Sequence, residues 1–522
     1  MYANTETPFF VDFYFPSNTI GADQNYPIIN IFGFFTMNDF TLTTTLFFTA
    51  HWLIVIGLSI RVIMRRRPVG VSLAWLAVIF SVPFVGALFY FFIGESRIGD
   101  QYLARAAKIH DLYRSWQITL QKRASREKPP VGHREMKAIQ IHAKTVAGFP
   151  TMSGNKMDLM DHFESIFQTI IEDVDRAKST CHLEFYIWTV GGKADEVAEA
   201  LIRAANRGVI CRVLLDAVGS KEFLRSELAQ RLRDSGIHVV ASLPVGPLRM
   251  LMTRADLRNH RKIVVIDGEI AYTGSQNLVD PRFFKQDEGV GQWIDAMVRM
   301  EGPSVEALAG TFIEDWELDT GEGLKALEET SDIRSIAGKG TTPVQVVPSG
   351  PAIRPEIIHQ LLLTTIYGAQ RKLLLTTPYF VPDESLMTAL ISAAHRQVDV
   401  TIVVPAEVDS RLVHYASRSL FDDLMSAGVT IAAFNGGLLH TKSITVDDEI
   451  CVFGTVNLDM RSLWLNFEVS LFIYDLEFTE QVRDMQVNYI NNSKILSLAE
   501  WRQRSLVQQF AENAAQLVGP LL

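Results

Sequence analysis

The sequence predicts an α/β protein built from two copies of one α/β unit, preceded by a helical hairpin that enters a membrane. Three observations lead to this prediction. Segments with strand and helix patterns alternate from about residue 146 to the C-terminus, a His-x-Lys-x4-Asp motif occurs twice, and two long uncharged runs lie near the N-terminus. Strands that alternate with helices are typical of a mixed or parallel sheet packed between helices.

The composition agrees with a membrane-associated protein of two or three domains. The chain has 522 residues, 48% of them hydrophobic, and a mean hydropathy of +0.12. The net charge of −10 gives no indication of a nucleic-acid partner. Cys181, Cys211 and Cys451 are the three cysteines, and none lies at metal-ligand spacing. We therefore expect no disulfide framework, no metal and no cofactor.

The two uncharged runs cover residues 41–60 and 69–94. A membrane-spanning helix needs about 20 mostly apolar residues, so both runs are long enough. The prediction is an N-terminal extension at 1–40 followed by a two-helix membrane hairpin at 41–94, with a kink tolerated at Pro83. The alternative is one span followed by a buried core helix.

The basic residues do not agree on the membrane topology. The loop between the runs carries Arg61, Arg65, Arg66 and Arg67, whereas residues 1–40 contain no lysine or arginine. The positive-inside rule places this loop in the cytoplasm. Residues 95–145 form a further basic juxtamembrane segment, which fits an anionic cytoplasmic leaflet. Two full spans would put that segment on the other side, so the side that carries the rest of the chain stays open.

Two α/β units are predicted in the part of the chain after residue 146. In the first, the patterns predict a strand at 181–190, a helix at 194–208 and a strand at 209–219. The second repeats this order with a strand at 372–381, a helix at 383–397 and a strand at 398–405. We predict one domain at 146–336 and another at 337–522, with the Gly/Thr/Pro-rich stretch 337–355 as their connection.

The repeated motif reads HRKIVVID at 260–267 and HTKSITVD at 440–447. Side chains two positions apart in a strand point to the same face, so His260 projects with Lys262, and His440 with Lys442. Asp267 and Asp447 lie where a hairpin turn is expected. Each aspartate therefore has two interpretations, a catalytic group or a residue that only caps its turn.

Each motif is continued by Gly-[Ser/Thr]-x-Asn, and the asparagine follows its histidine by 17 residues in both copies. Adjacent hairpin strands can return these small polar residues to the His-Lys pair. Each half then offers a nucleophile or base, a cation and hydrogen-bond donors at one point. The alternative, two surface hairpins with ordinary polar faces, does not account for two copies at identical spacing within matching α/β units.

This arrangement resembles the phospholipase D superfamily, and more closely its bacterial cardiolipin synthases. The resemblance covers nearly the whole chain and rests on stretches such as MRRRPVGVSLAWL, DLRNHRKIVVIDGEIAYTGSQNLVDPRFF and GGLLHTKSITVDDE. It implies two pseudo-symmetric phospholipase D-like α/β domains that share one active site. It also implies a multi-pass protein of the bacterial inner membrane.

The same resemblance implies roles for individual residues. His260 would be the nucleophile and His440 the general acid and base, while Lys262 and Lys442 would hold the phosphate. The remaining implied groups are the phosphate-binding Ser275, Asn277, Thr455 and Asn457, and the histidine-orienting acids Asp295 and Glu468. An acceptor that fixes the imidazole tautomer is what such a histidine needs. Without the resemblance, either acid could be an exposed strand residue.

The implied reaction converts two phosphatidylglycerol molecules into cardiolipin and glycerol through a phosphohistidine. The implied partners are phosphatidylglycerol and anionic membrane lipid, with no nucleic acid, and the chain could form a homo-oligomer. The stretch LPVGPLRMLMTRADLR at 243–258, with Arg249, Arg254 and Arg258, suits an interface with anionic headgroups or is an ordinary basic loop. The alternatives are a membrane-bound phospholipase D that hydrolyses phospholipids, a nuclease, and a non-catalytic membrane scaffold.

Overall fold

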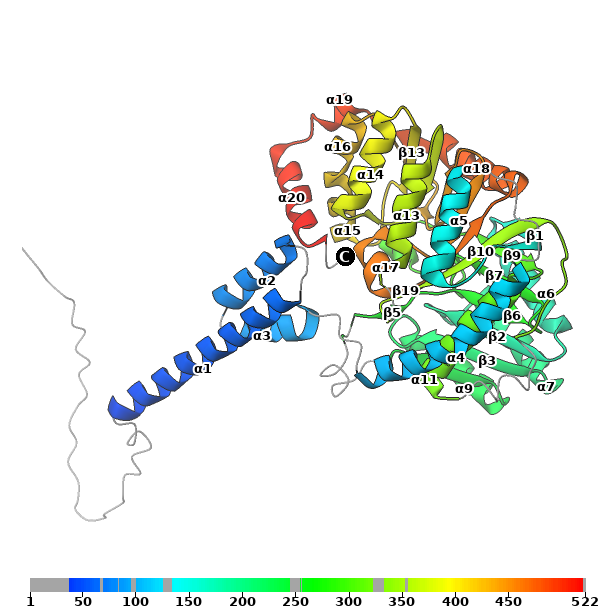
Figure 1. Ribbon diagram of the computed structural model, residues 1–522, viewed down its shortest axis with the longest axis horizontal. Coiled ribbons are helices and arrows are strands. Elements are labelled where there is room, and N and C mark those ends of the chain that lie inside the picture. Colours follow the sequence, from blue (N-terminus) through cyan, green and yellow to red (C-terminus); the bar gives the residue numbers. More distant parts are fainter. Residues whose placement is uncertain are drawn as a thin grey trace, which may run out of the picture. The chain divides into compact units, whose positions relative to one another are not determined.

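The computed structural model describes residues 37–65, 69–82, 84–94, 100–124, 134–244, 254, 256–322, 333–352 and 355–519 (Figure 1). The chain forms two compact units, Met1–Tyr90 and Phe91–Leu522. Most of the predicted N-terminal extension at 1–40 lies outside the described residues. So do Arg66, Arg67, Pro83 and Arg249.

The first unit is helical. Its elements are α1 (Met37–Met64), α2 (Val69–Ser81) and α3 (Val85–Phe89). The stretch Leu42–Met64 of α1 is long and apolar enough to cross a membrane. Most of its large apolar side chains are exposed, and Val55 and Val62 pack against Ile79 of α2. Such a surface suits lipid on all sides that α2 does not cover.

The second predicted span is not a single helix. Helix α2 has 13 residues, which at about 1.5 Å per residue gives roughly 20 Å, short of a hydrocarbon core of about 30 Å. The run then continues as α3 and one π-helical turn, η1 (Tyr90–Gly94). Within the described ranges α1 alone meets the criteria for a span, so the multi-pass prediction is not supported.

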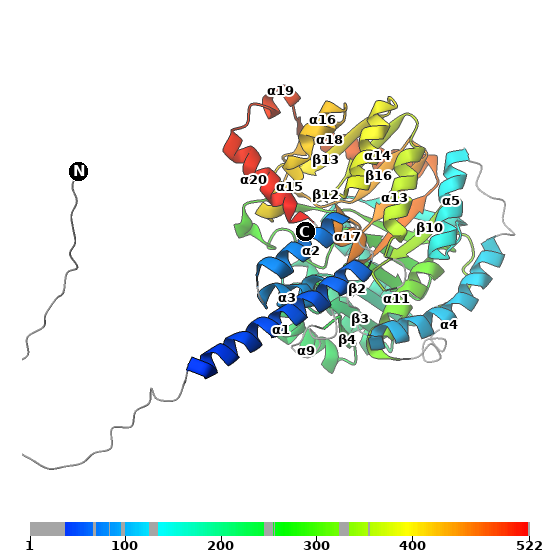
Figure 2. The same cartoon turned by 60° about the vertical axis from the view of Figure 1, so that its left-hand side comes forward.

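The basic segment 95–145 supplies two helices to the second unit. Helix α4 (Asp100–Ala124) packs on α11 (Val305–Thr320), and α5 (Arg134–Ala147) packs on α13 (Ile357–Gly368). Trp116 Nε1 donates to Glu306 at 2.9 Å, and His142 Nδ1 lies 2.8 Å from Thr364 Oγ1. Figure 2 shows α4 and α5 in cyan along one edge of the unit. The two helices are thus part of this unit.

The first half of the unit follows the predicted alternation of strands and helices, with boundaries within a few residues. Its elements are β1 (Met152–Met160), α6 (Phe163–Arg176), β2 (Thr180–Phe185), α7 (Lys193–Asn206), β3 (Ile210–Asp216), α8 (Lys221–Leu224), α9 (Glu227–Asp234), β4 (His238–Ser242), β5 (Arg258–Asn259), β6 (Ile263–Ile266), β7 (Ile270–Gly274), η2 (Gln286–Glu288), β8 (Trp293–Ile294), β9 (Met297–Glu301) and α11.

The second half has a similar order of strands and helices, with additional short elements. Its elements are β10 (Thr342–Ser349), α13, β11 (Lys372–Thr376), β12 (Phe380–Val381), α14 (Glu384–His395), β13 (Asp399–Pro405), α15 (Arg411–Ser419), α16 (Phe421–Ser426), β14 (Thr430–Phe434), β15 (Leu438–Leu439), β16 (Ser443–Val446), β17 (Ile450–Gly454), β18 (Leu458–Asp459), α17 (Met460–Trp464), β19 (Asn466–Ile473), α18 (Leu476–Asn491), β20 (Ser493–Ile495), α19 (Leu498–Trp501) and α20 (Leu506–Leu517).

One 16-stranded sheet runs through both halves. Its order is β20-β14-β13-β11-β16-β17-β19-β10-β1-β9-β7-β6-β2-β3-β4, with β5 attached to β19. Each half contributes three parallel strands, β2-β3-β4 and β11-β13-β14, next to an antiparallel set that contains its motif hairpin. The antiparallel pair β1–β10 joins the halves. Figure 1 shows α14 and α16 at one end of this unit, and α7 and α9 at the other.

The predicted connection at 337–355 contains strand β10, so it joins the two halves as part of the sheet. Strand β10 pairs with β19 over six residues and also with β1. Pro343 and Pro348 lie in this strand, although proline is rare inside sheets. Four residues between these prolines are fully buried, and their burial outweighs the missing donors.

Three hydrophobic clusters hold the layers together. One lies between the helices α6 and α7 and the first half of the sheet, and another lies between α13, α14 and α16 and the second half. The third includes α11, α18 and strands from both halves. The two motif hairpins therefore start from strands that are packed on both faces.

Candidate active site

Each motif forms the predicted hairpin. Strand β6 pairs with β7 so that Ile263 lies opposite Thr273, and β16 pairs with β17 so that Ser443 lies opposite Phe453. One position earlier, this register brings Lys262 opposite Gly274, and Lys442 opposite Gly454. The small polar residues after each glycine thus return to the His-Lys pair, as the spacing predicted.

Both glycines are required by a close approach of the backbone. A Cβ on Gly274 would lie 2.4 Å from the carbonyl oxygen of Ala296, and one on Gly454 would lie 2.3 Å from that of Val469. No side-chain carbon fits at such a distance. The chain at Ala296, next to Asp295, and strand β19, which carries Glu468, can therefore lie directly against the motif hairpins.

Two short parallel ladders bring the halves together at the histidines. Strand β5 pairs with β19, and β15 pairs with β8. The backbone N–H of His260 donates to Phe467 at 2.9 Å, and that of His440 donates to Ile294 at 2.8 Å. Each histidine therefore follows a strand that is hydrogen-bonded to the other half.

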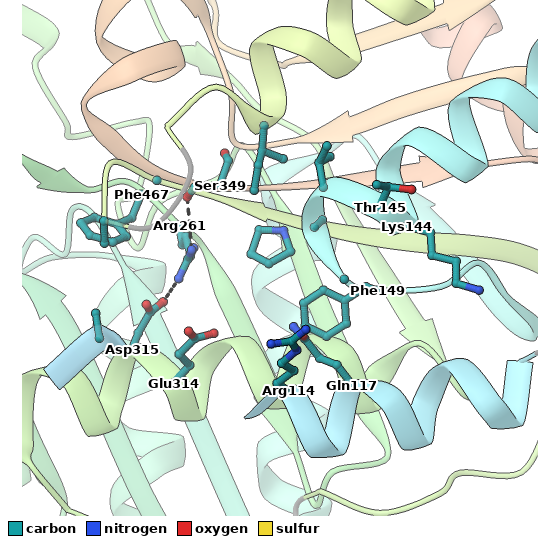
Figure 3. Close-up of a pocket in the computed structure, with 18 of the residues that line it drawn as sticks. Arg114, Gln117, Lys144, Thr145, Phe149, Arg261, Glu314, Asp315, Ser349 and Phe467 are labelled. Atoms are coloured by element: carbon teal, nitrogen blue, oxygen red, sulfur yellow. Dashed lines mark hydrogen bonds and ion pairs between the residues drawn. The ribbon is translucent and has the colours of Figure 1, made fainter. Parts of the chain in front are cut away.

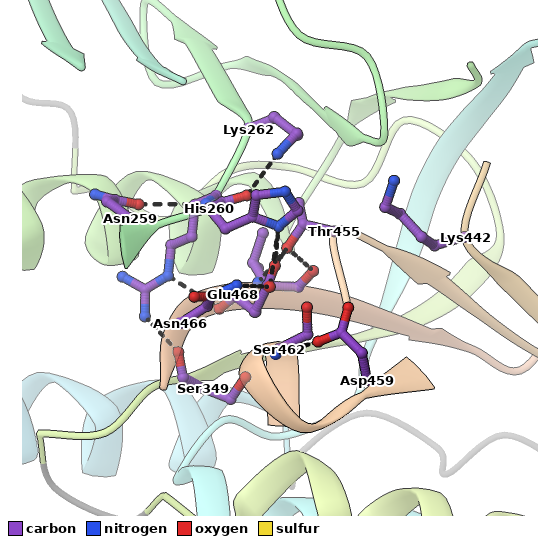
Figure 4. Close-up of polar contacts among 12 residues, drawn as sticks. Asn259, His260, Lys262, Ser349, Lys442, Thr455, Asp459, Ser462, Asn466 and Glu468 are labelled. Atoms are coloured by element: carbon purple, nitrogen blue, oxygen red, sulfur yellow. Dashed lines mark hydrogen bonds and ion pairs between the residues drawn. The ribbon is translucent and has the colours of Figure 1, made fainter. Parts of the chain in front are cut away.

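These ladders place each histidine on the acid of the opposite half. Nδ1 of His260 lies 2.9 Å from both carboxylate oxygens of Glu468, and Nδ1 of His440 lies 2.6 Å from Asp295 Oδ1. Figure 4 shows the Glu468 carboxylate between the His260 imidazole and the Thr455 hydroxyl. Because Nδ1–H donates to the carboxylate, Nε2 is the free nitrogen of each neutral ring. Both acids occupy the orienting position that the resemblance implied.

The two lysines are buried beside their histidines. Lys262 Nζ donates to the His260 carbonyl at 2.8 Å, and Lys442 Nζ donates to the His440 carbonyl at 2.5 Å. Burial lowers the pKa of Lys262 to about 8 and that of Lys442 to about 7, although Asp295 and Glu468 act in the opposite direction. An ammonium with two unused donors in such a place is ready to receive an anion.

The electrostatics show that the two motifs form one cluster. Burial lowers the pKa of each histidine to about 4, and the charges of both lysines contribute to the shift of each one. Burial alone would raise the pKa of Asp295, but His440 and Lys442 bring it below its ordinary value. Both histidines are therefore neutral at pH 7 in the unliganded protein. A bound phosphodiester anion would raise the pKa of all four bases.

The hydroxyls of Ser275 and Thr455 contact the orienting acids. Thr455 Oγ1 donates to Glu468 at 2.5 Å, and a hydrogen bond from Ser275 lowers the pKa of Asp295. Ser275 Oγ also accepts from Ala296 N–H at 3.0 Å, and Thr455 Oγ1 from Val469 N–H at 2.9 Å. In the unliganded protein these hydroxyls contact the carboxylates and the backbone that position the histidines, and their binding to phosphate stays a prediction.

The two asparagines keep unused polar atoms. Asn277 Oδ1 accepts from Ile187 N–H at 3.1 Å, but its Nδ2 is buried with no hydrogen-bond partner. Asn457 has a buried Oδ1 without a partner, and its side chain is also hydrogen-bonded to Asp459. An unpartnered buried amide donor is costly unless a ligand satisfies it. Asn277 is thus well suited to a phosphate oxygen.

The motif aspartates lie away from this cluster, so their assignment as catalytic residues is corrected. Asp267 follows the last residue of β6, and the seven positions from His260 correspond to roughly 20 Å of extended chain. Its carboxylate accepts from the backbone N–H groups of Lys178, Ser179 and Thr180 at 2.7–3.2 Å. Asp447 does the same for three N–H groups at 370–372, at 2.7–2.8 Å. Both aspartates cap the loop before a central strand.

Replacing Asp267 with alanine should therefore destabilise the protein without impairing its chemistry. Three backbone donors lose their acceptor, and Asp267 has a φ of 53°, which alanine tolerates poorly. We expect a loss of about 1–3 kcal/mol in the free energy of unfolding. Turnover per folded molecule should stay within about threefold, because an effect through stability alone changes the amount of folded protein and not its rate. Asp267→Asn is the matched control, since asparagine tolerates this φ and keeps an acceptor. A rate loss above tenfold in soundly folded Asp267→Ala would contradict the capping role.

Sequence reasoning missed Arg261, which lies between the histidine and lysine of the first motif. It is buried, forms an ion pair with Asp315, and donates to the carbonyl oxygens of Glu468 at 3.0 Å and Ser349 at 3.2 Å. It therefore fastens the first motif to the strand that carries Glu468. The second motif has Thr441 at this position, so a comparison of the two copies marks Arg261 as a difference but does not reveal its contacts.

Two aromatic rings next to the histidines were also missed. The ring of Tyr186 lies 5.0 Å from that of His260, and Lys262 Nζ lies 5.6 Å from the same tyrosine ring. Trp293 lies 4.4 Å from the His440 ring. These rings exclude water from the imidazoles and restrict their orientation. The sequence analysis places Tyr186 within the predicted strand 181–190 and assigns no element to Trp293, so neither ring was marked.

A cavity of about 420 Å³ lies behind the first motif and is separate from the histidine pair. Arg261 and Asp315 form part of its wall, and Arg114 and Gln117 of α4 lie on another side (Figure 3). Burial and the neighbouring Asp315 raise the pKa of Glu314, a further lining residue, to about 7. Neither motif histidine lines this cavity. Across the described ranges, no group of three or more His, Cys, Asp or Glu side chains is placed to hold a metal ion.

Comparisons with known proteins agree with this geometry. The family described as "Cardiolipin synthase, PLD-like domain" matches residues 170–316 and 362–487, and "Phospholipase_D-nuclease N-terminal" matches residues 53–95. Cardiolipin synthase A of Escherichia coli is 42% identical over 485 residues, and that of Pectobacterium carotovorum is 42% identical over 483 residues. Each alignment covers 92% of this chain and 99% of the relative.

A solved structure shares the fold. The crystal structure of phosphatidylserine synthase from Haemophilus influenzae Rd KW20 has a TM-score of 0.56 and 17% sequence identity. It covers 74% of this chain and 100% of its own. At this identity the likeness concerns the fold alone. The family match and the relatives at 42% identity go further: the chain belongs to the cardiolipin synthase family of the phospholipase D superfamily.

Proposed function

We propose that the protein transfers a phosphatidyl group from one phosphatidylglycerol molecule to another, giving cardiolipin and glycerol. The observation that carries the proposal is the crossed arrangement of the histidines, in which each half orients the histidine of the other. Family membership and the apolar helix α1, which keeps the chain at a membrane, support a lipid substrate. The two halves are proposed to be pseudo-symmetric domains that share this one site.

The first step uses a nucleophile and an acid. Nε2 of His260 attacks phosphorus and forms a phosphatidyl-histidine, while the bond from phosphorus to the glycerol oxygen breaks. His440 supplies the proton that the leaving glycerol needs. In the second step neutral His440 takes the proton from the terminal hydroxyl of another phosphatidylglycerol, whose oxygen attacks phosphorus and releases His260. Two phosphatidylglycerol molecules thus give one cardiolipin and one glycerol, with no net proton change.

The lysines and Asn277 stabilise the phosphoryl oxygens. Negative charge on these oxygens repels an attacking nucleophile, and two buried ammonium groups compensate it as it shifts in the transition state. The Asn277 amide has an unpartnered donor for the same purpose. Because the incoming anion raises the pKa of Lys262, Lys442 and His440, substrate binding itself puts these bases in the charge state that the reaction requires.

The two acids differ in a way that supports this division of roles. Glu468 accepts hydrogen bonds from His260, Thr455 and Asn466, so its charge is spread over several donors. Among the described residues, Asp295 accepts only from His440 and Ser275, and its Oδ2 is buried without a hydrogen-bond partner. A less compensated carboxylate stabilises an imidazolium better. This difference favours His440 as the residue that carries the proton.

The test is incubation of purified full-length protein with phosphatidylglycerol vesicles, followed by mass spectrometry of the lipids. Cardiolipin and free glycerol in equal amounts are the expected products, and a chelator should leave the rate unchanged. Phosphatidic acid as the main product would identify a hydrolase. The absence of any new lipid would favour a scaffold, and cleavage of added DNA would favour a nuclease.

A further inference from the structure

The C-terminal helix α20 exposes an unusual amount of apolar surface. Four of its side chains, Leu506, Val507, Phe510 and Leu517, are 82%, 79%, 75% and 83% exposed. These fractions equal or exceed those of every large apolar side chain on the described part of α1. The only charged residue within α20 is Glu512, which is buried. The solvent-facing side of a helix in a soluble protein normally carries charges. An exposed face without charges therefore indicates a contact with an apolar partner.

The exposed residues form one stripe. Leu506, Phe510 and Leu517 recur at intervals of four and seven residues, which places them on one line along a helix with 3.6 residues per turn. Val507 lies at the edge of this stripe. Glu512 and Ala515 lie on the opposite side and are buried.

Strong contacts on the buried side fix the direction of the stripe. Arg418 Nε donates to Glu512 at 2.9 Å, and Arg504 forms an ion pair with the same carboxylate. Both arginines stack on Trp501, at 4.4 and 4.0 Å from the ring centroid. The Ser505 side chain caps the helix by accepting from Gln508 N–H at 3.2 Å. These contacts of the buried face therefore hold the apolar stripe outward.

The buried side also connects α20 to the active site. Ala515 packs with Val381 and Ala416, and Val381 pairs with Asp459 in the ladder of β12 and β18. Strand β18 begins directly after Asn457. The helix thus lies beside the strand that leaves the second motif.

We propose that the apolar stripe of α20 inserts into the interfacial layer of the bilayer from which the active site takes its lipid. The helix has 12 residues, about 18 Å, so it is too short to span a hydrocarbon core of about 30 Å. An amphipathic helix of this kind lies in the membrane plane with its apolar side among the acyl chains. Helix α1 of the same chain is long and apolar enough to cross a membrane, and the relatives are cardiolipin synthases. The proposal rests on the proposed function in one respect, the lipid nature of the substrate.

The decisive measurement is made on the full chain in phosphatidylglycerol-containing vesicles. All three native cysteines are buried, so a cysteine in place of Phe510 can be labelled alone with an environment-sensitive fluorophore. We expect lipids with a nitroxide near the headgroup end of an acyl chain to quench this label at least twofold. The control Asn206→Cys, exposed at the end of α7, should be quenched little. Repeating the measurement in the His260→Ala protein keeps the result independent of catalysis.

Activity gives a second, separable readout. Phe510→Glu should lower turnover on vesicles at least fivefold and leave turnover on dispersed short-chain phosphatidylglycerol within twofold. Phe510→Leu is the matched control and should keep activity on both substrates. Equal activity of Phe510→Glu on vesicles, or a label at position 510 that water-soluble iodide quenches and nitroxide lipids do not, would overturn the proposal. Efficient crosslinking between two chains through the thiol of the Phe510→Cys variant would also overturn it, because the stripe would then be covered by a second copy of the protein and not by lipid. Absence of cardiolipin from both substrates with the unsubstituted protein would instead count against the proposed function.

Discussion

Replacing Lys442 with methionine should lower the rate of phosphatidyl transfer on the order of 10³-fold and, at pH 7, raise the melting temperature of the lipid-free protein. The rate loss follows from the role of a buried ammonium opposite the phosphoryl oxygens. Removal of one preorganised donor to a developing oxyanion costs about 10²–10³-fold, and here a full charge is removed as well. Methionine matches the length of the lysine stem, so little packing is lost.

The stabilisation follows from the lowered pKa. Lys442 has a folded-state pKa of about 7 against an ordinary value of 10.5, so between these pH values the unfolded chain binds more protons than the folded one. Stability of the native protein therefore falls as pH decreases from 10.5 towards 7, and the cost is largest below 7. Lys442→Met removes this cost. We expect a gain of about 2 °C or more at pH 7 that disappears as the pH approaches 10.

Differential scanning fluorimetry across pH 6–10, together with lipid product analysis, checks both parts. Lys262→Met should behave alike, with a smaller stabilisation because the pKa of Lys262 is lowered only to about 8. Lys494→Met is a matched control on an exposed side chain and should change neither quantity. A Lys442→Met protein that is both destabilised and active would show that this lysine is structural.

The sequence was sufficient for the parts of the site that depend on local geometry. Period-two alternation placed His260 with Lys262, and the hairpin turn returned Asn277 to the same end of the strands. Both features depend on contacts within about 20 residues. The same reasoning could not decide between the two interpretations of Asp267, because its acceptor role involves backbone groups at 178–180, almost 90 residues away.

The sequence could not predict the contacts between the halves for the same reason, since they join residues that lie far apart in the chain. The resemblance marked Asp295 and Glu468 as orienting acids, but it did not say which histidine each one serves. That pairing is set by the ladders β5–β19 and β8–β15, which form only when the halves assemble. Arg261 depends on the same assembly, since its partners lie 54 to 207 residues away.

The Gly/Thr/Pro-rich composition of residues 337–355 predicted a connection between domains, but it did not indicate that strand β10, at the centre of the sheet, lies within this stretch. The second uncharged run was long enough for a spanning helix, whereas the structure has two separate α-helices in it, α2 and α3. Propensity is a weak guide when tertiary packing or length decides the outcome.

His260→Ala should abolish formation of the covalent intermediate with every substrate, whereas His440→Ala should retain it with one particular kind of leaving group. The two variants are matched controls for each other, since each removes one imidazole from the same buried cluster. Turnover of phosphatidylglycerol should fall by at least about 10⁴-fold in both, because a nucleophile and a general acid that act as a unit are each indispensable. Turnover alone therefore cannot distinguish their roles.

A phosphatidyl ester of p-nitrophenol separates them. Its phenolate departs without a proton, so His440→Ala should release p-nitrophenol in a burst equal to the enzyme concentration and then stop, because no base activates the acceptor. His260→Ala has no atom at this position to carry the phosphatidyl group and should give no burst. Peptide mass analysis under acid-free conditions should locate the adduct on the peptide that contains residue 260. An adduct at residue 440 in His260→Ala would reverse the assignment.

The geometry gives a reason to expect this order and not its reverse. A residue that gives and takes a proton needs a partner whose charge favours the imidazolium, and Asp295 has one oxygen on His440 and the other buried without a partner. A nucleophile needs a neutral ring held in one tautomer, and Glu468 provides this with both oxygens at 2.9 Å while Thr455 shares its charge. Thr455→Val should therefore return charge to Glu468 and make His260 more basic. In a pH profile of the p-nitrophenol burst, this variant should shift the acidic limb to higher pH, while Ser275→Ala should leave that limb unchanged.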